Sequence, residues 1–370
     1  MRRFCRTDWG VAAAKNRHMQ ATPTLIAPRP APTGRTDIDA PWIQWVAEGL
    51  LRDCSPDSMV EAMVRAGFDR FYARAALEEV GGDPVFDAAR RHQQLHRKLE
   101  SVVESLQAVL QSAPNYGQVE RRAGISADEL MERYVCGMRP VILTDVATEW
   151  PALAKWTPQY LKERFGISIV EIQADRERDP QYEPNKLQHR DVTTMGEFVE
   201  RVLAGGPTND YYLTANNEVL RSEVYAPLLD EVGNLPSICD RSALAGRSSF
   251  WFGPAGTVTP LHHDSVMLFH TQIYGRKRWR LISPLDTPKV YNFNGYFSAV
   301  DLDRPDLARF PRFAQARVLD VILEQGETIF LPLAWWHHVT SLEVSISFSY
   351  TNLALPNDAR YANPSIDNWV

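Results

Sequence analysis

The C-terminal two-thirds of the chain carries short apolar runs separated by turn-forming residues. Residues 344–350 alternate strictly between apolar and small polar side chains, which is the pattern of a half-buried β-strand. Gly, Pro, Asn and Asp bound the other runs, as expected for strands joined by tight turns. We predict strands in these runs: 250–254, 268–274, 278–282, 328–331 and 344–350. This part of the chain is therefore predicted to form a small β-barrel or sandwich.

Two glycines lie where tight turns are needed between these runs. Gly256 follows Pro254-Ala255, and Gly326 lies within residues 324–327. Glycine enters the left-handed region of backbone space without a steric penalty. We therefore expect a positive φ angle at both glycines, in turns that deliver the strands of the barrel.

A helical pattern precedes the predicted barrel. Ser55-Pro56 and Asp83-Pro84 each combine an N-cap residue with a proline at the first helical position. In the last and longest predicted helix, seven aliphatic residues recur at helical spacing. They are Leu95, Leu99, Val102, Val103, Leu106, Val109 and Leu110. We interpret this stripe as core packing or a homodimer contact, with a docking surface for a carrier or partner protein as the alternative.

The patterns divide the chain into three regions. Residues 1–40 are predicted to be a disordered leader, because several prolines interrupt any periodic pattern there. Residues 41–115 are predicted to be a helical accessory region, which contains no cluster of candidate ligands. Residues 116–370 are predicted to be the catalytic domain, since all the candidate chemistry lies there.

Two histidines and one aspartate form the most informative motif. The first two ligands lie in the sequence Thr259-Pro-Leu-His-His-Asp264, and the third, His337, lies in a Trp-Trp-His-His sequence further downstream. Residues two apart on a strand share a face, so His262 and Asp264 can hold the same metal, and a small barrel would bring His337 to them. Two imidazoles and one carboxylate bind Fe(II) and leave coordination positions open for chemistry.

Over roughly residues 120–352, the chain resembles the JmjC or cupin-like class of Fe(II)- and 2-oxoglutarate-dependent oxygenases. The resemblance rests on several segments in the family's order, and the last of them is similar to the arginyl-hydroxylase branch. These segments are 139–143, 149–152, 251–254, 259–264, 275–277, 301–307 and 310–313. The resemblance implies a mainly β fold with accessory helices, in which a double-stranded β-helix (jelly-roll) core follows a helical N-terminal region.

Carried over position by position, the resemblance makes His262, Asp264 and His337 the catalytic iron ligands. It makes Lys277 the cation that binds the distal carboxylate of 2-oxoglutarate, and a buried carboxylate needs such a partner. Thr259 and Tyr212 match hydroxyl donors to the same carboxylate, although the neighbouring Tyr211 would replace Tyr212 if the strand parity were opposite.

The chain departs from the family pattern next to the cosubstrate. At Leu268 some relatives carry an asparagine, which leaves one expected polar contact unfilled. His270 lies two residues further along the same strand face and is a candidate to compensate. The adjacent His263 and His338, like His270, are interpreted in the first place as packed or hydrogen-bonded histidines.

The activity implied by the resemblance is hydroxylation of a C–H bond, with dioxygen as co-reactant and oxidative decarboxylation of 2-oxoglutarate to succinate. The substrate is then a peptide, a protein side chain or an amino acid, free or tethered to a carrier. Candidate pocket residues lie in loops: Asp179, Tyr182, Asn216, Asn217 and Glu218. Demethylation of an N-methyl lysine or arginine by the same oxidant is an alternative. A metal-binding cupin without 2-oxoglutarate and a non-catalytic binding module are two others.

Composition limits the partners. The net charge of −6 and the pI near 5.9 argue against general attraction to nucleic acid or to an anionic membrane. No apolar run approaches the roughly 20 residues that span a bilayer. The four cysteines, Cys5, Cys54, Cys136 and Cys239, are widely spaced without a paired motif. They are therefore predicted to be free thiols in a reducing compartment, which favours a cytoplasmic location.

Overall fold

The computed structural model describes residues 35–215 and 218–357. The predicted leader therefore lies almost wholly outside the described residues, as do Asn216 and Asn217. Contacts divide the chain into two compact units. Of the described residues, the first unit holds 35–109 and Asp306–Ala314, and the second holds those of Leu110–Pro305 and 315–357.

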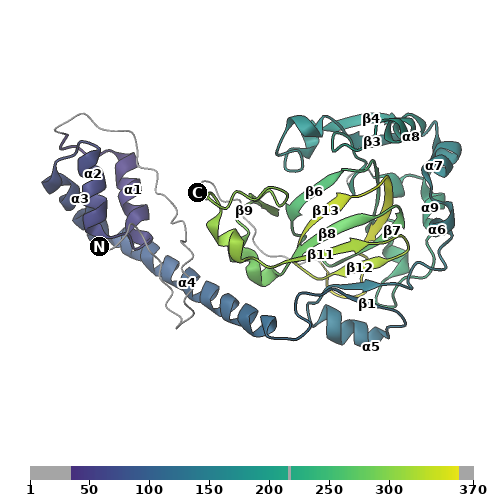
Figure 1. Ribbon diagram of the computed structural model, residues 1–370, viewed down its shortest axis with the longest axis horizontal. Helices are drawn as coiled ribbons and strands as arrows, with labels where there is room; N and C mark the ends of the chain where they lie inside the picture. The colour runs from purple at the N-terminus through teal and green to yellow at the C-terminus, as the bar shows by residue number, and fades with distance from the viewer. Residues whose placement is uncertain (1–34, 216–217, 358–370) are drawn as a thin grey trace. The chain divides into compact units, whose positions relative to one another are not determined.

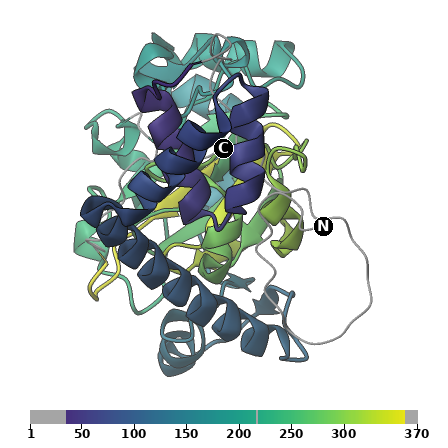
Figure 2. The same ribbon diagram turned by 90° about the vertical axis from the view of Figure 1, so that its left-hand side faces the viewer.

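The N-terminal unit is helical, as the pattern predicts (Figure 1 and Figure 2). Pro56 and Pro84 each open a helix. Asp83 caps the longest helix by accepting hydrogen bonds from the Val85 and Phe86 amides, whereas the Ser55 side chain makes no capping bond among the described residues. The helices are α1 (Ala40–Leu51), α2 (Pro56–Arg65), α3 (Arg70–Gly82) and α4 (Pro84–Gln111).

A compact apolar core holds α1, α2 and α3 together. Trp42 and Met59 are fully buried, and the Trp42 ring makes edge-on contacts with Trp45 at 5.3 Å and Phe68 at 4.9 Å between ring centroids. Aromatic pairs in this geometry add to the free energy gained from area burial. The bundle therefore has its own hydrophobic core.

The aliphatic stripe of α4 is exposed, so its interpretation as core packing is wrong. The side chains of Leu95, Leu99, Val102 and Leu106 are each more than half exposed. Spacing alone distinguishes one helix face from another, but it does not say what covers that face. The homodimer contact and the docking surface stay as predictions for this stripe.

The prediction of four free thiols is wrong for Cys54. Cys136 and Cys239 are free, whereas the buried Cys54 is disulfide-bonded. Distance along the chain does not limit distance in space, so wide spacing was not evidence against pairing. The argument from cysteines to a reducing compartment loses its support at this residue.

The second unit is built on two six-stranded sheets that face each other (Figure 1). The first sheet runs in the order β1 (Glu120–Arg122), β2 (Val141–Leu143), β12 (Thr328–Leu331), β7 (Leu268–Tyr274), β14 (Ser345–Tyr350), β5 (Ser248–Gly253). The second runs β11 (Val318–Leu323), β8 (Lys277–Ile282), β13 (Trp336–Ser341), β6 (Val258–His262), β10 (Phe297–Ser298), β9 (Asn292–Asn294). The non-consecutive order and the mainly antiparallel pairing confirm the predicted jelly-roll core.

Helices cover the outer face of the first sheet (Figure 1). Its strands alternate, so that Phe250, Phe252 and Phe348 point outward into a core shared with Trp156 and Phe198 of this helical layer. The layer consists of α6 (Pro151–Lys155), α7 (Pro158–Phe165), α8 (Met195–Ala204), α9 (Ala226–Asp230) and a two-stranded sheet, β3 (Ile169–Gln173) and β4 (Arg190–Thr194). A short helix, α5 (Ala127–Glu129), lies after β1.

A second apolar cluster fills the space between the two sheets. It includes Ile142, Ile329, Leu281 and Leu319, which are buried side chains from both sheets. The turns that connect the strands adopt the expected backbone, with φ of +86° at both Gly256 and Gly326. The packed core therefore holds the two sheets rigidly together, and the turns set the direction in which each connected strand begins.

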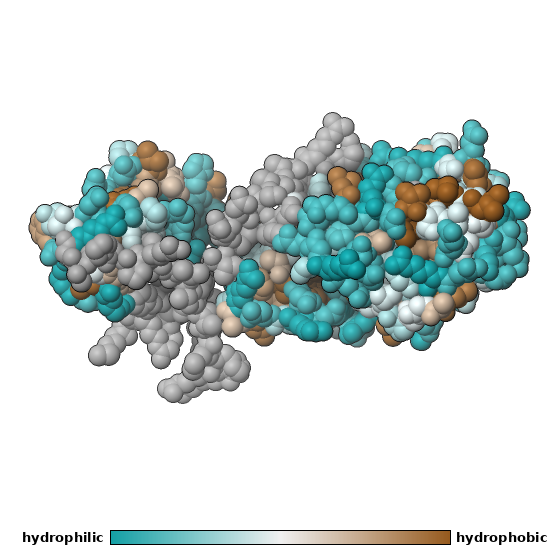
Figure 3. All heavy atoms as spheres, turned by 90° about the horizontal axis from the view of Figure 1, so that it is seen from above, coloured by the Kyte–Doolittle hydropathy of each residue, from teal (hydrophilic) through white to brown (hydrophobic). Residues whose placement is uncertain are grey.

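The face of the molecule shown in Figure 3 is mainly hydrophilic over the described residues, with separate hydrophobic patches. Among the described residues, exposed apolar side chains include Ile167, Leu187 and Val192 of the second unit. Scattered exposed apolar residues are normal for a folded protein. Within the described ranges, no helix combines the length and apolar character needed to cross a bilayer.

A polar substitution in the α4 stripe distinguishes exposure from core packing. We predict that Leu99→Glu changes the free energy of unfolding by less than about 0.5 kcal/mol, because the side chain is already solvated. Met59→Ala, in the bundle core, should cost about 2–5 kcal/mol. Chemical denaturation of the full chain measures both values.

The same variant tests the predicted homodimer contact. If the stripe joins two copies, the molecular mass of Leu99→Glu measured by light scattering should fall to that of a monomer. An unchanged dimer mass would contradict that contact.

Candidate metal centre

Three side chains from two distant segments of the sequence converge in the second unit. One ligand atom from each of His262, Asp264 and His337 lies within 4.8 Å of the other two. The His262 and His337 ring centroids are 4.0 Å apart, and Nε2 of His337 is 3.7 Å from Oδ2 of Asp264. Atoms at these separations can contact a single ion placed between them.

Strand pairing creates this proximity. His262 is the last residue of β6 and stands directly opposite His337 of β13 in the antiparallel register. Asp264 lies just beyond the end of β6, so the carboxylate comes from the segment after the strand. We predicted that His262 and Asp264 lie on one face of the same strand. Instead, His262 ends the strand and Asp264 lies in the segment that follows it.

Backbone carbonyls orient both imidazoles in the same way. Nδ1 of His262 lies 2.8 Å from the carbonyl oxygen of Pro260, and Nδ1 of His337 lies 2.9 Å from that of Trp335. A carbonyl oxygen only accepts, so each Nδ1 must carry the proton. Each Nε2 is then left with its lone pair, which is the form that binds a metal.

Burial keeps the second imidazole neutral. His337 is almost fully buried, and burial lowers its pKa well below the usual value, with the nearby His262 acting in the same direction. A neutral imidazole does not need to lose a proton before it binds a cation. This ligand is therefore ready for metal at physiological pH.

The adjacent histidines lie outside the cluster. His263 packs edge-on against Trp336 at 4.6 Å and Tyr296 at 5.4 Å between ring centroids. His338 points to the opposite face of β13, where it lies 3.5 Å from a carboxylate oxygen of Asp303 and hydrogen-bonds with Arg280. Alternation along the strand explains why one histidine of each pair faces the metal site.

A β-bulge places Thr259 on the same face as the metal ligands. Thr259 is three residues before His262, and regular alternation would direct it to the other face. However, Val339 pairs with Thr259 while His337 pairs with His262, so β6 holds one extra residue in this interval. The bulge includes Pro260, which has no amide N–H to lose from the ladder. Thr259 therefore faces the barrel interior, as its predicted role requires.

Lys277 lies on this inner face as well. It pairs with Ser341 of β13, and Ser341, Val339 and His337 alternate along one side of the strand. The lysine side chain is about 1% exposed, and its Nζ donates to the Tyr212 hydroxyl at 2.9 Å. Burial alone lowers the pKa of Lys277 to about 7, and no carboxylate of the described residues lies within ion-pair distance of Nζ. The interior therefore contains a cation without a counter-charge.

Tyr212, and not its neighbour, lies at the site. The Tyr211 hydroxyl donates to the carbonyl oxygen of Arg201, away from Lys277, while the Tyr212 ring is fully buried beside Trp251. Burial raises the pKa of Tyr212, so its hydroxyl stays protonated. The ambiguity in strand parity is thus resolved by the structure in favour of Tyr212.

The sequence reasoning missed Arg176, which supports the site from behind. Its fully buried guanidinium lies 5.3 Å from the Tyr212 ring centroid and 4.3 Å from that of Tyr182. It donates to the carbonyl oxygen of Val258, next to Thr259, and pairs with Glu183 at 3.0 Å. No motif marked this arginine, because only the fold brings its loop against β6.

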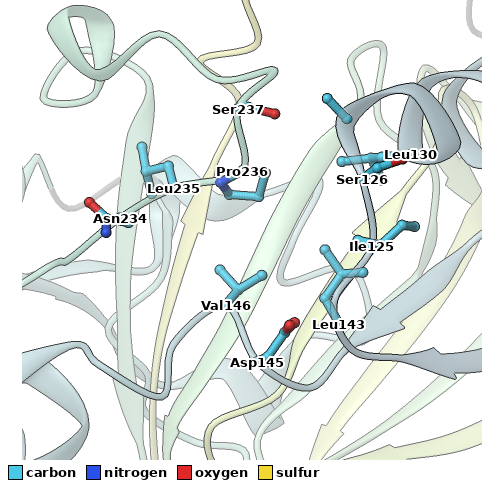
Figure 4. A pocket seen from close by; sticks show the side chains of 11 residues that line it. Ile125, Ser126, Leu130, Leu143, Asp145, Val146, Asn234, Leu235, Pro236 and Ser237 are labelled. Atoms are coloured by element: carbon cyan, nitrogen blue, oxygen red, sulfur yellow. The ribbon is translucent and has the colours of Figure 1, made fainter.

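A separate cavity lies on another part of the second unit. It measures about 220 Å³ and is lined by residues from the α5 region and from the segment 234–237 (Figure 4). Leu130, Leu143 and Leu235 supply apolar walls, and Asp145 supplies a carboxylate. None of the three candidate metal ligands lines this cavity.

Comparison with known proteins agrees with the geometry. The family described as the cupin-like domain matches residues 127–352, which is more than half of the chain. The chain belongs to the cupin-like JmjC family. The match covers the barrel strands from β2 onward, the helical layer and the three converging side chains, whereas β1 and the N-terminal helices precede it.

Several curated relatives share this cupin-like region. Lysine-specific demethylase 8 of Xenopus tropicalis is 33% identical over 232 residues, covering 61% of this chain and 50% of that protein. Lysine-specific demethylase JMJ30 of Arabidopsis thaliana is 32% identical, covering 63% and 54%. The tRNA wybutosine-synthesizing protein 5 of Gallus gallus is 26% identical, covering 63% and 76%. The chain spans about half the length of the first two relatives.

Metal binding tests the cluster directly. We predict that one Fe(II) or Co(II) ion binds per chain and that Asp264→Ala or His337→Ala abolishes tight binding, because each removes one of the converging ligand atoms. His338→Ala is the matched control, since this adjacent histidine faces the other side of β13. Anaerobic titration calorimetry measures the stoichiometry. Equal metal content in Asp264→Ala and the unaltered chain would contradict the prediction.

The buried lysine predicts a trade-off between stability and binding. Without a dicarboxylate, the Lys277→Met variant should be more stable than the unaltered chain below pH 7, by up to roughly 5 kcal/mol, because the buried ammonium is removed. The unfolded chain keeps its lysine proton up to about pH 10.5, so stability of the unaltered chain rises with pH above 7 and the difference shrinks. Denaturation at pH 6 and pH 9 measures it. A Lys277→Met variant that is less stable at pH 6 would refute it.

Proposed function

We propose that this protein is an Fe(II)- and 2-oxoglutarate-dependent dioxygenase that hydroxylates a C–H bond of a peptide, a protein side chain or an amino acid. The observation that carries the proposal is the unpaired, buried ammonium of Lys277 on the same inner face as His337. A metal-binding cupin without a dicarboxylate would have no use for this cation. Membership of the cupin-like JmjC family supports the same function.

The donor set fits iron. Two neutral imidazole nitrogens and one carboxylate oxygen form the facial set typical of Fe(II) oxygenases, in which the remaining positions stay open for the cosubstrate and dioxygen. Iron held in this way supplies the oxidising chemistry, coupled to decarboxylation of 2-oxoglutarate to succinate. The roles of His262, Asp264 and His337 in the protein are to hold the ion and to leave one side of it accessible.

The interior beside the ligands fits a dicarboxylate. Lys277 would bind the distal carboxylate as a charge-assisted hydrogen-bond donor, and the Tyr212 and Thr259 hydroxyls would complete the contacts. Bringing a negative charge next to Lys277 removes the penalty for burying its ammonium. Trp251 lies 5.7 Å from Nζ of Lys277, and Trp279 belongs to the apolar cluster between the sheets, so two aromatic rings flank the proposed position of the cosubstrate.

Demethylation of an N-methyl group is the second candidate. Two relatives are named lysine-specific demethylases, and the same oxidant acts on N-methyl and C–H groups. The two reactions differ in their products, since demethylation releases formaldehyde and hydroxylation leaves the new oxygen on the substrate. The difference between them depends on which substrate carbon is held near the iron.

We propose that the primary substrate is basic and binds without nucleic acid or membrane. The net charge of −6 favours a cationic partner. Arginine- and lysine-containing peptides, free basic amino acids and a carrier-tethered amino acid all satisfy this requirement. A cytoplasmic setting remains a prediction.

Succinate formation tests the proposed function. With Fe(II), 2-oxoglutarate and dioxygen, the chain should form succinate, and Lys277→Ala should lower the rate at least about a hundredfold at limiting 2-oxoglutarate, because a charge-assisted contact is lost. His338→Ala is the control outside the site. Equal, iron-independent succinate in the unaltered chain and Lys277→Ala would refute the function.

Product analysis then separates the two reactions. Peptides with arginine, lysine or methylated lysine are incubated separately, and each product is analysed for one added oxygen atom and for formaldehyde. We expect oxygen addition without formaldehyde on at least one substrate. Formaldehyde in amounts equal to succinate would assign the demethylase reaction instead.

A further inference from the structure

A third buried histidine faces the barrel interior beside the candidate metal centre. His270 lies in the middle of β7, where it pairs with Ile329 on one side and Ser349 on the other. Ile329 belongs to the core between the two sheets, and Ser349 accepts a hydrogen bond from the indole of Trp251. Residues that stand opposite each other share a face, so the His270 side chain points inward.

The Nε2 atom of His270 is buried without a hydrogen-bond partner among the described residues. The residue is only 4% exposed. An unsatisfied buried nitrogen is destabilising, and a leucine in this place would avoid the penalty. The position is therefore costly unless another molecule supplies the missing partner.

The surroundings of this nitrogen relate it to the candidate site. The His270 ring centroid lies 4.9 Å from that of Trp279, which in turn lies 5.8 Å from that of His337. Trp251 flanks the other side at 6.1 Å and also lies 5.7 Å from Nζ of Lys277. The same two tryptophans thus contact the histidine, the metal ligand and the lysine. The Trp279 Nε1 atom is a second buried donor without a partner in the described part of the chain.

The residue before His270 on this inner face is apolar. Leu268 precedes it by two positions and belongs to the core between the sheets. The polar contact expected at Leu268 from the family resemblance is therefore absent there, and the nearest polar side chain on the same face of β7 is His270.

We propose that His270 is a positioning residue for the dicarboxylate cosubstrate and that its Nε2 donates a hydrogen bond to an oxygen of that molecule. This inference rests on the proposed function. Neutral imidazole carries one N–H, and a carboxylate oxygen only accepts, so the Nε2–H tautomer is the one that binds. With Lys277 as the cation, His270 supplies a neutral donor that restricts the orientation of the cosubstrate.

Anaerobic titration of 2-oxoglutarate into the full-length chain loaded with Fe(II) tests the proposal. The visible charge-transfer band of the iron–2-oxoglutarate chelate reports both binding and geometry, without turnover. We expect His270→Leu to raise the Kd for 2-oxoglutarate at least about tenfold and to shift the band, with unchanged affinity for Fe(II) alone. His270→Met tests the same point if the leucine variant is unstable.

Two further variants test whether a hydrogen bond, and not packing, is lost. His270→Gln returns a donor at the same position, and the double variant Leu268→Asn/His270→Leu returns one two residues away on the same face. We expect recovery of affinity in at least one of them. Thr271→Val is the matched control, because Thr271 lies on the same strand and its hydroxyl bonds to Thr328 on the other face.

The outcomes separate this proposal from the function on which it rests. Unchanged affinity in His270→Leu overturns the role of His270 while Lys277→Ala still reports on the function. Equal weakening in His270→Leu and Thr271→Val, or no recovery in either donor variant, also overturns it. If the unaltered chain forms no iron–2-oxoglutarate chelate, both the inference and the proposed function fail.

Discussion

The antiparallel pairing of β6 (Val258–His262) with β13 (Trp336–Ser341) is the constraint on which the candidate site depends. It places His262 directly opposite His337, although 74 residues lie between them in the sequence. The ladder also fixes which face each side chain takes, and a bulge in β6 corrects the parity of Thr259. A slip of one residue would turn His337 outward and His338 inward. The candidate metal cluster and the proposed cosubstrate face thus both depend on this one register.

The same type of backbone hydrogen bond orients both candidate metal-binding imidazoles. In His262 and His337, Nδ1 is bonded to the carbonyl oxygen two residues earlier. The Trp335 carbonyl is itself held in place, because the indole of Trp335 donates to the carbonyl oxygen of Met138. Ala334, just before it, adopts a φ of +60°, a conformation that costs energy for a residue with a side chain. The turn before β13 therefore stores strain next to the candidate ligand that it presents.

The interior of the barrel combines stable packing with unmet polar groups. Around the core of Ile329, Leu281 and other aliphatic side chains, the described structure contains an ammonium without a counter-charge and two ring nitrogens without partners. Each lowers the stability of the folded protein, and under the proposed function an anionic cosubstrate would offset the cost of burying the ammonium. A purely apolar interior would avoid these costs. The large core between the first sheet and its helical layer supplies stability independently of this interior.

The sequence by itself determined the elements and the types of ligand. Period-two alternation predicted the strand at 344–350, and apolar runs bounded by turn residues predicted those at 268–274 and 328–331. Proline after an N-cap residue predicted the starts of α2 and α4. These signals depend only on near neighbours. Only the tertiary structure decided what each face contacts. It left the α4 stripe exposed, paired Cys54, placed Tyr212 rather than Tyr211 beside Lys277, and placed Arg176 behind Tyr212. It also left Nε2 of His270, which the sequence had already marked as a candidate, without a partner among the described residues. Exposure, register shifts and buried unpaired groups arise from contacts between distant segments, and no local pattern in the chain records such contacts.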